Sequence, residues 1–158
     1  MATIRPLRPP DHEPLRQLYL GAPIEDRCTR FCARVSDEHV LRHIERSVGK
    51  ADTLLGAFES DRLVGAAEVF LDDGCAELAF LVARRAQRQG VGKALMAAAL
   101  SAATGFGARK GIVITARDNR PMHRLALASG MTRTLADDAE WMAEIDLAVV
   151  AAPLPLAL

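Results

Sequence analysis

The chain has 158 residues, half of them apolar and a quarter charged, which is the composition of an ordinary globular domain. Twenty Lys and Arg residues balance twenty Asp and Glu residues, which excludes a general electrostatic attraction to nucleic acid or to an anionic membrane surface. Aromatic residues make up only 4%, which argues against a base-stacking platform for single strands. We therefore expect one domain over residues 1–158, with no nucleic-acid partner and no membrane partner.

Cysteine usage and the absence of targeting signals indicate a reducing compartment. The three cysteines, Cys28, Cys32 and Cys75, are odd in number and lack the C-x-x-C spacing, so we expect free thiols and no metal site. The N-terminus "MATIRPLRPP" has no apolar core of a signal peptide, and no apolar stretch is as long as a membrane span. We expect a cytoplasmic protein.

The first half of the chain predicts one strand, two helices and a hairpin. Asp11 is the expected N-cap of the first helix, and Ser36 is the expected N-cap of the second. Between the helices, residues 22–35 are polar and rich in arginine, and we expect them to be irregular. The ranges are a strand at 3–7, helices at 11–21 and from 36, and strands at 53–60 and 62–71.

The second half predicts a strand, a helix, a strand, a helix and a strand. The strand at 75–83 is almost wholly apolar, so we expect it to be central. In the helix at 91–104 we expect Val91, Leu95, Ala98 and either Leu100 or Ala102 to face inward. The remaining elements are a strand at 111–116, a helix at 118–130 with Asn119 near its cap and Gly130 at its stop, and a strand at 140–150.

This order of elements is typical of a mixed α/β sheet flanked by helices. The strands at 75–83 and 111–116 are joined by one helix, so they should be parallel, with a right-handed crossover. The tail at 147–158 is apolar, and we expect it to pack on the domain or on a second copy of the chain, which would make a homodimer.

The stretch "QRQGVGKALM", residues 87–96, is a glycine turn that opens a helix. A P-loop needs Gly at 87 and Ser or Thr at 94, where this chain has Gln and Ala. The dinucleotide fingerprint needs Gly or Ala at 95, where this chain has Leu. The turn is therefore not built for a nucleoside triphosphate or for a nicotinamide cofactor.

Two interpretations of the turn remain open. Free amides of residues 88–93 and the helix dipole favour an anion, and glycines at 90 and 92 allow a ligand to approach the backbone. Nearby cations suit a pyrophosphate: Arg84, Arg85, Arg88 and Lys93. The alternative is a plain helix start with a solvated basic cap.

"FLVARRAQRQGVGKALM" resembles the acetyl-coenzyme A binding motif of the GNAT acetyltransferases, and "DNRPMHRLALASGM" resembles that family's second signature. The resemblance covers nearly the whole chain. Within the family, "RPLRPPDHEPLRQLY", "IEDRCTRF" and "AELAFLV" are similar to the acetyltransferase domain of bacterial protein lysine acetyltransferases. The resemblance implies the GNAT fold, a central mixed sheet flanked by helices, with acetyl-CoA as cosubstrate and an amine acceptor.

The resemblance also implies where the coenzyme would lie. The backbone of the strand end would pair with the pantetheine arm like an added strand. Asn119 would lie near the pantetheine or the sulfur. The residues at the strand end are Leu81, Val82 and Ala83, and those at the pyrophosphate are Gln87, Arg88, Gln89, Gly90, Val91, Gly92 and Lys93.

Direct attack of an amine on the thioester needs a base, since a lysine ammonium has a pKa of about 10.4 and is not a nucleophile. Glu77, in the apolar strand "AELAF", is the candidate base, because partial desolvation would raise its pKa. The matching glutamate of the protein-acetylating relatives is the proposed base. The alternatives are that Glu77 is a solvated or ion-paired glutamate at the sheet margin, or that Glu68 on the neighbouring strand is the base.

The tyrosine that the family often uses as general acid aligns with Ala126, and the only tyrosine, Tyr19, is distant in the sequence. We assign no acid, and we leave the nearby His123 without a role. In the 22–35 segment, Glu25 and Asp26 could attract a lysine-bearing acceptor. Three hypotheses follow: an N-acetyltransferase, with a protein lysine favoured over a small amine; a catalytically silent acetyl-CoA sensor; and a pure interaction protein.

Overall fold

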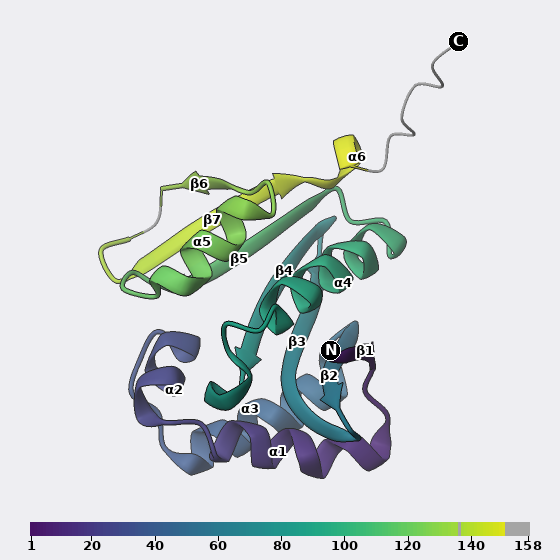
Figure 1. The fold of residues 1–158 in the computed structure, drawn as a ribbon. Coiled ribbons are helices and arrows are strands. Elements are labelled where there is room, and N and C mark those ends of the chain that lie inside the picture. Colours follow the sequence, from purple (N-terminus) through teal and green to yellow (C-terminus); the bar gives the residue numbers. More distant parts are fainter. Residues whose placement is uncertain (136, 151–158) are drawn as a thin grey trace.

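Seven strands form one sheet in the order β1-β2-β3-β4-β5-β7-β6 in the computed structural model, which describes residues 1–135 and 137–150 (Figure 1). Every neighbouring pair is antiparallel except β4 with β5, which is parallel. The strands are β1 (Thr3–Pro6), β2 (Thr53–Glu59), β3 (Arg62–Asp72), β4 (Cys75–Val82), β5 (Lys110–Ala116), β6 (Thr132–Thr134) and β7 (Glu140–Asp146). The mixed α/β sheet and its central parallel pair are confirmed.

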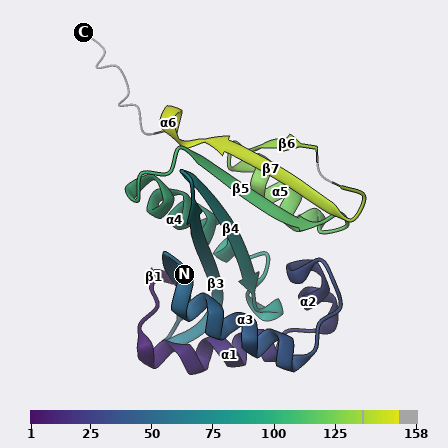
Figure 2. The same cartoon turned by 180° about the vertical axis from the view of Figure 1, so that it is seen from behind.

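Helices cover both faces of this sheet. α4 and α5 lie on one face and α3 on the other, as the front and rear views show (Figures 1 and 2). The helices are α1 (His12–Leu20), α2 (Ile24–Phe31), α3 (Asp37–Lys50), α4 (Val91–Gly105), α5 (Arg120–Ala128) and α6 (Leu147–Val150). In the described ranges no helix is both long and apolar enough to cross a membrane.

The core has two parts, one on each face. Side chains of α1 and α3 pack with Ala66 and Leu81 on one face, while α4 packs against Leu78 and Phe80 on the other. Successive residues of a strand point to opposite faces, so Glu77 lies on the α1–α3 face together with Leu81. In α4 the buried stripe continues through Ala99 and Ala103, and the predicted Ala98, Leu100 and Ala102 are only partly buried.

Helix boundaries follow local chemistry, with one correction at a cap. Ser36 Oγ accepts from the backbone N–H of His39 at 3.1 Å, as the sequence predicts. Asp11 precedes α1, but its carboxylate does not cap that helix. It instead forms hydrogen bonds with the guanidinium of Arg5, at 2.7 and 3.0 Å, and with the Arg8 backbone N–H.

Three elements were not predicted. One is α6, because the strand expected at 140–150 ends at Asp146 and the chain continues as a helix. The segment expected to be irregular contains α2, which has acids in its first turn and Arg30 in its last, as the helix dipole favours. The short edge strand β6 follows α5, where Gly130 adopts φ +88 and redirects the chain. The expected packing of the C-terminal tail falls largely on residues 151–158, which lie outside the described residues.

Candidate active site

The two parallel strands separate at one end, and this opens a gap in the sheet. Register pairs join Cys75–Leu78 of β4 to Lys110–Val113 of β5, and both strands continue beyond them, to Val82 and Ala116. The diverging ends are visible above α2 in Figure 1. Backbone groups of β4 beyond Leu78 that point toward β5 therefore have no strand partner there among the described residues, and the Val82 carbonyl accepts from Gln87 Nε2 at 3.0 Å.

A cleft of about 470 Å³ occupies this gap. It extends from the glycine turn, past the separated strands, to α2 and α5. Its lining residues are Asp26, Thr29, Arg30, Leu78–Val82, Gln87, Arg88, Gly90, Gly92, Lys93, Val113–Thr115, Asp118, Asn119, Pro121, Met122, Arg124 and Leu125.

At the glycine turn, Gly90 is the N-cap of α4 and adopts φ +84. An added Cβ at Gly90 would meet no atom within 4 Å, so the glycine is required by the backbone conformation, and the space beside it is open to a ligand. Arg88 and Lys93 line the same end of the cleft. A helix N-terminus with open space and cations is suited to bind an anion.

Of the predicted coenzyme residues, most but not all line the cleft. Those in the lining are Leu81, Val82, Gln87, Arg88, Gly90, Gly92, Lys93 and Asn119. Val91 is instead buried in the core, and Gln89 donates its side-chain amide to the Arg85 carbonyl at 2.8 Å. The Ala83 N–H donates to the Val64 carbonyl on β3 at 2.8 Å, so this N–H points away from the gap.

Glu77, the predicted base, lies outside the cleft lining. Its side chain is exposed on the α1–α3 face of β4, so the desolvation expected from the apolar strand does not occur. An apolar strand sequence does not guarantee a covered side chain, because helices cover only part of each face. The neighbouring residues Leu78 and Ala79 do line the cleft.

Glu68, the alternative base, is fully buried, and four polar side chains contact its carboxylate. Tyr19 donates its hydroxyl to Glu68, and Ser47 Oγ donates at 3.0 Å. His43 Nε2 lies 2.9 Å and Arg30 Nη2 3.1 Å from Glu68 Oε2. Burial alone would raise the pKa of Glu68, but Arg30, His43 and Tyr19 outweigh burial and hold this pKa below its usual range.

This cluster corrects the alternative assignment. A carboxylate is a weak base when its pKa is lowered and both of its oxygens already accept hydrogen bonds. We therefore assign Glu68 a structural role. It links α1, α2 and α3 to the central strand β3. One signal in the sequence indicated Glu68, an acid inside the apolar stretch "GAAEVF", but nothing indicated its partners Tyr19, Arg30, His43 and Ser47.

Asn119 and α5 form the opposite wall of the cleft. Asn119 Oδ1 accepts from the Met122 N–H at 3.3 Å, which confirms the predicted cap, and its Nδ2 donates to Thr115 Oγ1 at 2.8 Å. Ala126 is fully buried, so this position presents no group to the cleft. His123 stacks on Trp141, with ring centroids 4.1 Å apart.

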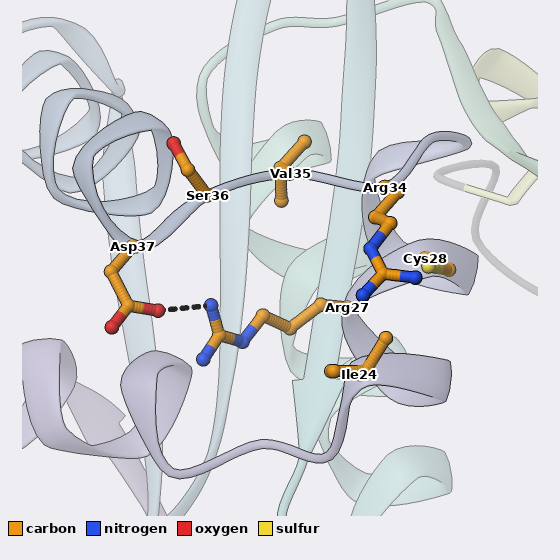
Figure 3. A pocket seen from close by; sticks show the side chains of 7 residues that line it. All are labelled: Ile24, Arg27, Cys28, Arg34, Val35, Ser36 and Asp37. Carbon is orange, nitrogen blue, oxygen red and sulfur yellow. Dashed lines mark hydrogen bonds and ion pairs between the residues drawn. The ribbon is translucent and has the colours of Figure 1, made fainter.

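A second, smaller hollow of about 260 Å³ lies on another side of α2 (Figure 3). Its lining residues include Ile24, Arg27 and Cys28, whereas Asp26, Thr29 and Arg30 of the same helix line the cleft. Arg27 Nη1 and Asp37 Oδ1 form an ion pair of 2.6 Å across this hollow. In the described part of the chain, no three His, Cys, Asp or Glu residues are grouped to hold a metal.

Comparison with known proteins adds a family model and several solved structures. The model described as "Acetyltransferase (GNAT) family" matches residues 15–131. The GNAT domain of PAT from S. lividans has a TM-score of 0.78 at 24% identity, over 92% of this chain and 90% of that chain. No curated protein gives a significant match.

Two further solved structures share the fold and contain the coenzyme. PaiA N-acetyltransferase from Thermoplasma acidophilum, in complex with coenzyme A, has a TM-score of 0.72 at 20% identity over 92% of this chain and 99% of that chain. A phosphinothricin acetyltransferase from Sinorhizobium meliloti, in complex with acetyl-CoA, has a TM-score of 0.72 at 15% identity over 92% and 88%.

Proposed function

Because this chain belongs to the GNAT family of acetyl-CoA-dependent acetyltransferases, we propose that it transfers the acetyl group of acetyl-CoA to a primary amine, that of a protein lysine side chain. The observation that carries the proposal is the continuity of one cleft from the glycine turn to the gap between β4 and β5. Acetyl-CoA needs such a path, because its pyrophosphate would lie at one end of the cleft and its thioester at the other.

The coenzyme pyrophosphate binds at the amides of residues 88–93, beside Arg88 and Lys93. The open space at Gly90 supports this placement. The pantetheine arm pairs with the free edge of β4 between Leu81 and Ala83, and Asn119 lies near its sulfur end. Gln87, Gln89, Val91 and Gly92 complete the turn.

The acetyl carbonyl lies between the separated strands, where the acceptor amine attacks it. A tetrahedral intermediate forms, and its oxyanion accepts a hydrogen bond from the backbone N–H of Phe80 or Val82, which is rigid and needs no reorganisation. Collapse of the intermediate breaks the C–S bond and releases the thiolate, and the second proton of the attacking nitrogen passes to the thiolate, so that a neutral amide and the free thiol result. A thiolate is the anion of a thiol with a pKa of about 8.5, so departure without a general acid is feasible, in accord with Ala126.

Glu77 accepts the proton of the acceptor ammonium, through water, because its carboxylate is exposed beside cleft residues of β4. Asp118 is the competing carboxylate, since it is exposed and lines the cleft itself. Glu77→Gln and Asp118→Asn remove one carboxylate each while keeping shape. Loss of turnover in only one of them, with coenzyme affinity kept, identifies the base.

A protein lysine is favoured as acceptor by the likeness to the GNAT domain of S. lividans PAT. A small amine is the second candidate, favoured by the likeness to the phosphinothricin acetyltransferase. A silent coenzyme sensor is the third, and Ala126 is the feature in its favour.

The test measures thiol release from acetyl-CoA by the wild type and Glu77→Gln, with lysine-bearing proteins, peptides and small amines as acceptors. Acceptor-dependent release establishes the enzyme, and the best acceptor identifies its class. Binding of acetyl-CoA without release on any acceptor would contradict the transfer and favour the sensor.

A further inference from the structure

Asp26 joins the acceptor side of the cleft to the coenzyme side. This residue lies on α2 and lines the cleft. Its Oδ1 accepts from Arg84 Nη2 at 2.7 Å, and its Oδ2 accepts from Gln87 Nε2 at 3.3 Å. Arg84 precedes the glycine turn and Gln87 is its first residue, so this carboxylate connects the turn to α2.

The side chain of Gln87 also occupies a backbone hydrogen-bond acceptor that the pantetheine arm would use. Its Nε2 donates to the Val82 carbonyl at 3.0 Å. The next residue, Ala83, donates its N–H to β3, and backbone groups of successive residues in a strand point to opposite sides. The Val82 carbonyl therefore faces the gap, and an amide of the pantetheine arm that donates to it competes with Gln87.

α2 is anchored in the core near its C-terminal end, where Arg30 pairs with the buried Glu68 at 3.1 Å and Phe31 packs against the α1–α3 core. None of its residues is buried. Toward the other hollow, Arg27 pairs with Asp37 and donates to the Leu20 carbonyl at 3.0 Å (Figure 3). Among the described residues, the first turn of α2 has no such anchor in the core. On the cleft side it is held by the contacts of Asp26 with Arg84 and Gln87.

We propose that Asp26 is a positioning residue that couples the coenzyme to the acceptor: it holds Gln87 on Val82 until the pantetheine arm displaces Gln87, and its Oδ2 atom then faces the acceptor ammonium while Oδ1 stays paired with Arg84. This inference rests on the proposed function. It assigns Asp26 opposite effects on the two ligands, since the same carboxylate opposes coenzyme binding and favours acceptor binding.

Removal of Asp26 should therefore change the two affinities in opposite directions. Without its second partner, Gln87 leaves Val82 more easily, and acetyl-CoA should bind about threefold to tenfold more tightly, as expected for one hydrogen bond. The acceptor KM should rise about twofold to fivefold, as expected for the loss of one partly exposed ion pair. General damage to the cleft would weaken both ligands.

Calorimetric titration of acetyl-CoA into the wild type, Asp26→Ala and Glu25→Ala tests the first effect. Glu25→Ala is the matched control, because it removes the same charge from the same helix, where Glu25 is 77% exposed and lies 3.9 Å from Arg84. Tighter binding in Asp26→Ala with less than twofold change in Glu25→Ala supports the coupling. Equal changes in both variants, or weaker binding in Asp26→Ala, would overturn it.

The Gln87→Ala variant, alone and combined with Asp26→Ala, completes a double-mutant cycle. If Asp26 acts through Gln87, adding Asp26→Ala to Gln87→Ala should not tighten acetyl-CoA binding further, and additive tightening would refute that path. Steady-state KM for the best acceptor then tests the second effect, and an unchanged value would overturn the role toward the ammonium. The titration needs no acceptor, so its result is separate from the proposed function: if no variant binds acetyl-CoA, the proposed function itself fails.

Discussion

Tyr19 and Glu68, 49 positions apart in the sequence, form a hydrogen bond in the core where neither side chain reaches solvent. The bond joins helix α1 to the central strand β3. The carboxylate also contacts Arg30 of α2 and His43 of α3, so it connects three helices at one point behind the cleft. A buried charge of this kind is costly alone, and its partners offset the desolvation.

Replacing Glu68 by Gln should therefore lower the free energy of unfolding by about 3–5 kcal/mol, because it leaves the guanidinium of Arg30 buried without a counter-charge. The matched control is Glu77→Gln, on the next strand and the same face of the sheet but exposed, which should change stability by less than about 0.5 kcal/mol. Urea unfolding of both variants measures the difference. Equal stability of the two variants would contradict the structural role of Glu68.

Acid should destabilise the fold through carboxylates whose pKa values are lowered in the folded state. A hydrogen bond from Arg5 is the largest effect on Asp11 and lowers its pKa to about 2, and burial opposes it. Since the folded pKa lies below the unfolded value of about 3.9, the stabilisation is complete above that value and is lost as the pH falls toward 2. Glu68 contributes in the same direction.

Thermal unfolding between pH 6 and pH 2 measures this effect, with Asp11→Asn as the test variant. The variant should be less stable than the wild type at pH 6, and the difference should shrink as the pH falls. A difference that stays constant over this range would show that the Asp11 charge does not matter.

Substitution at Gly90 should damage coenzyme binding more than folding. Valine at φ +84 is strained by about 1–2 kcal/mol, and its side chain would extend into the open space that we assign to the pyrophosphate. We expect acetyl-CoA affinity to fall more than about tenfold. Gly49→Ala in α3 is the control: its Cβ would meet no atom within 4 Å, and alanine should stabilise the helix by about 0.5–1 kcal/mol without an effect on affinity. Unchanged affinity in Gly90→Val by calorimetry would exclude the turn as the pyrophosphate site.

Local sequence signals predicted the parts of the fold that depend on local chemistry. Ser36 and Asn119 were identified as caps because a cap needs only a side-chain oxygen and a nearby N–H. The strand–helix–strand order predicted the parallel pair β4 and β5. The helix α2 was missed because most of its residues are polar and its apolar stripe is short: of Ile24, Cys28 and Phe31, only Phe31 packs against the core.

The candidate site was predictable only in part, for a physical reason. The glycine turn is contiguous in the sequence, so its residues were found together. Burial of a carboxylate depends on which helices cover the strand, and this depends on contacts between distant segments. Glu68 lies under α1 and α3 and is fully buried, while Glu77 on the same face is exposed, although both lie in apolar strand sequences.

Restoring a tyrosine at Ala126 should fail to supply a general acid. Ala126 is fully buried in the core, so a tyrosine there would overpack it and lower the free energy of unfolding by about 1–3 kcal/mol or more. Leu127→Tyr is the control, since the next residue of α5 is 51% exposed and should accept the ring with little change. Thermal unfolding and thiol release from acetyl-CoA measure the two effects. A stable Ala126→Tyr variant with faster turnover would show that the position reaches the reacting sulfur, and that the absence of an acid limits the wild-type rate.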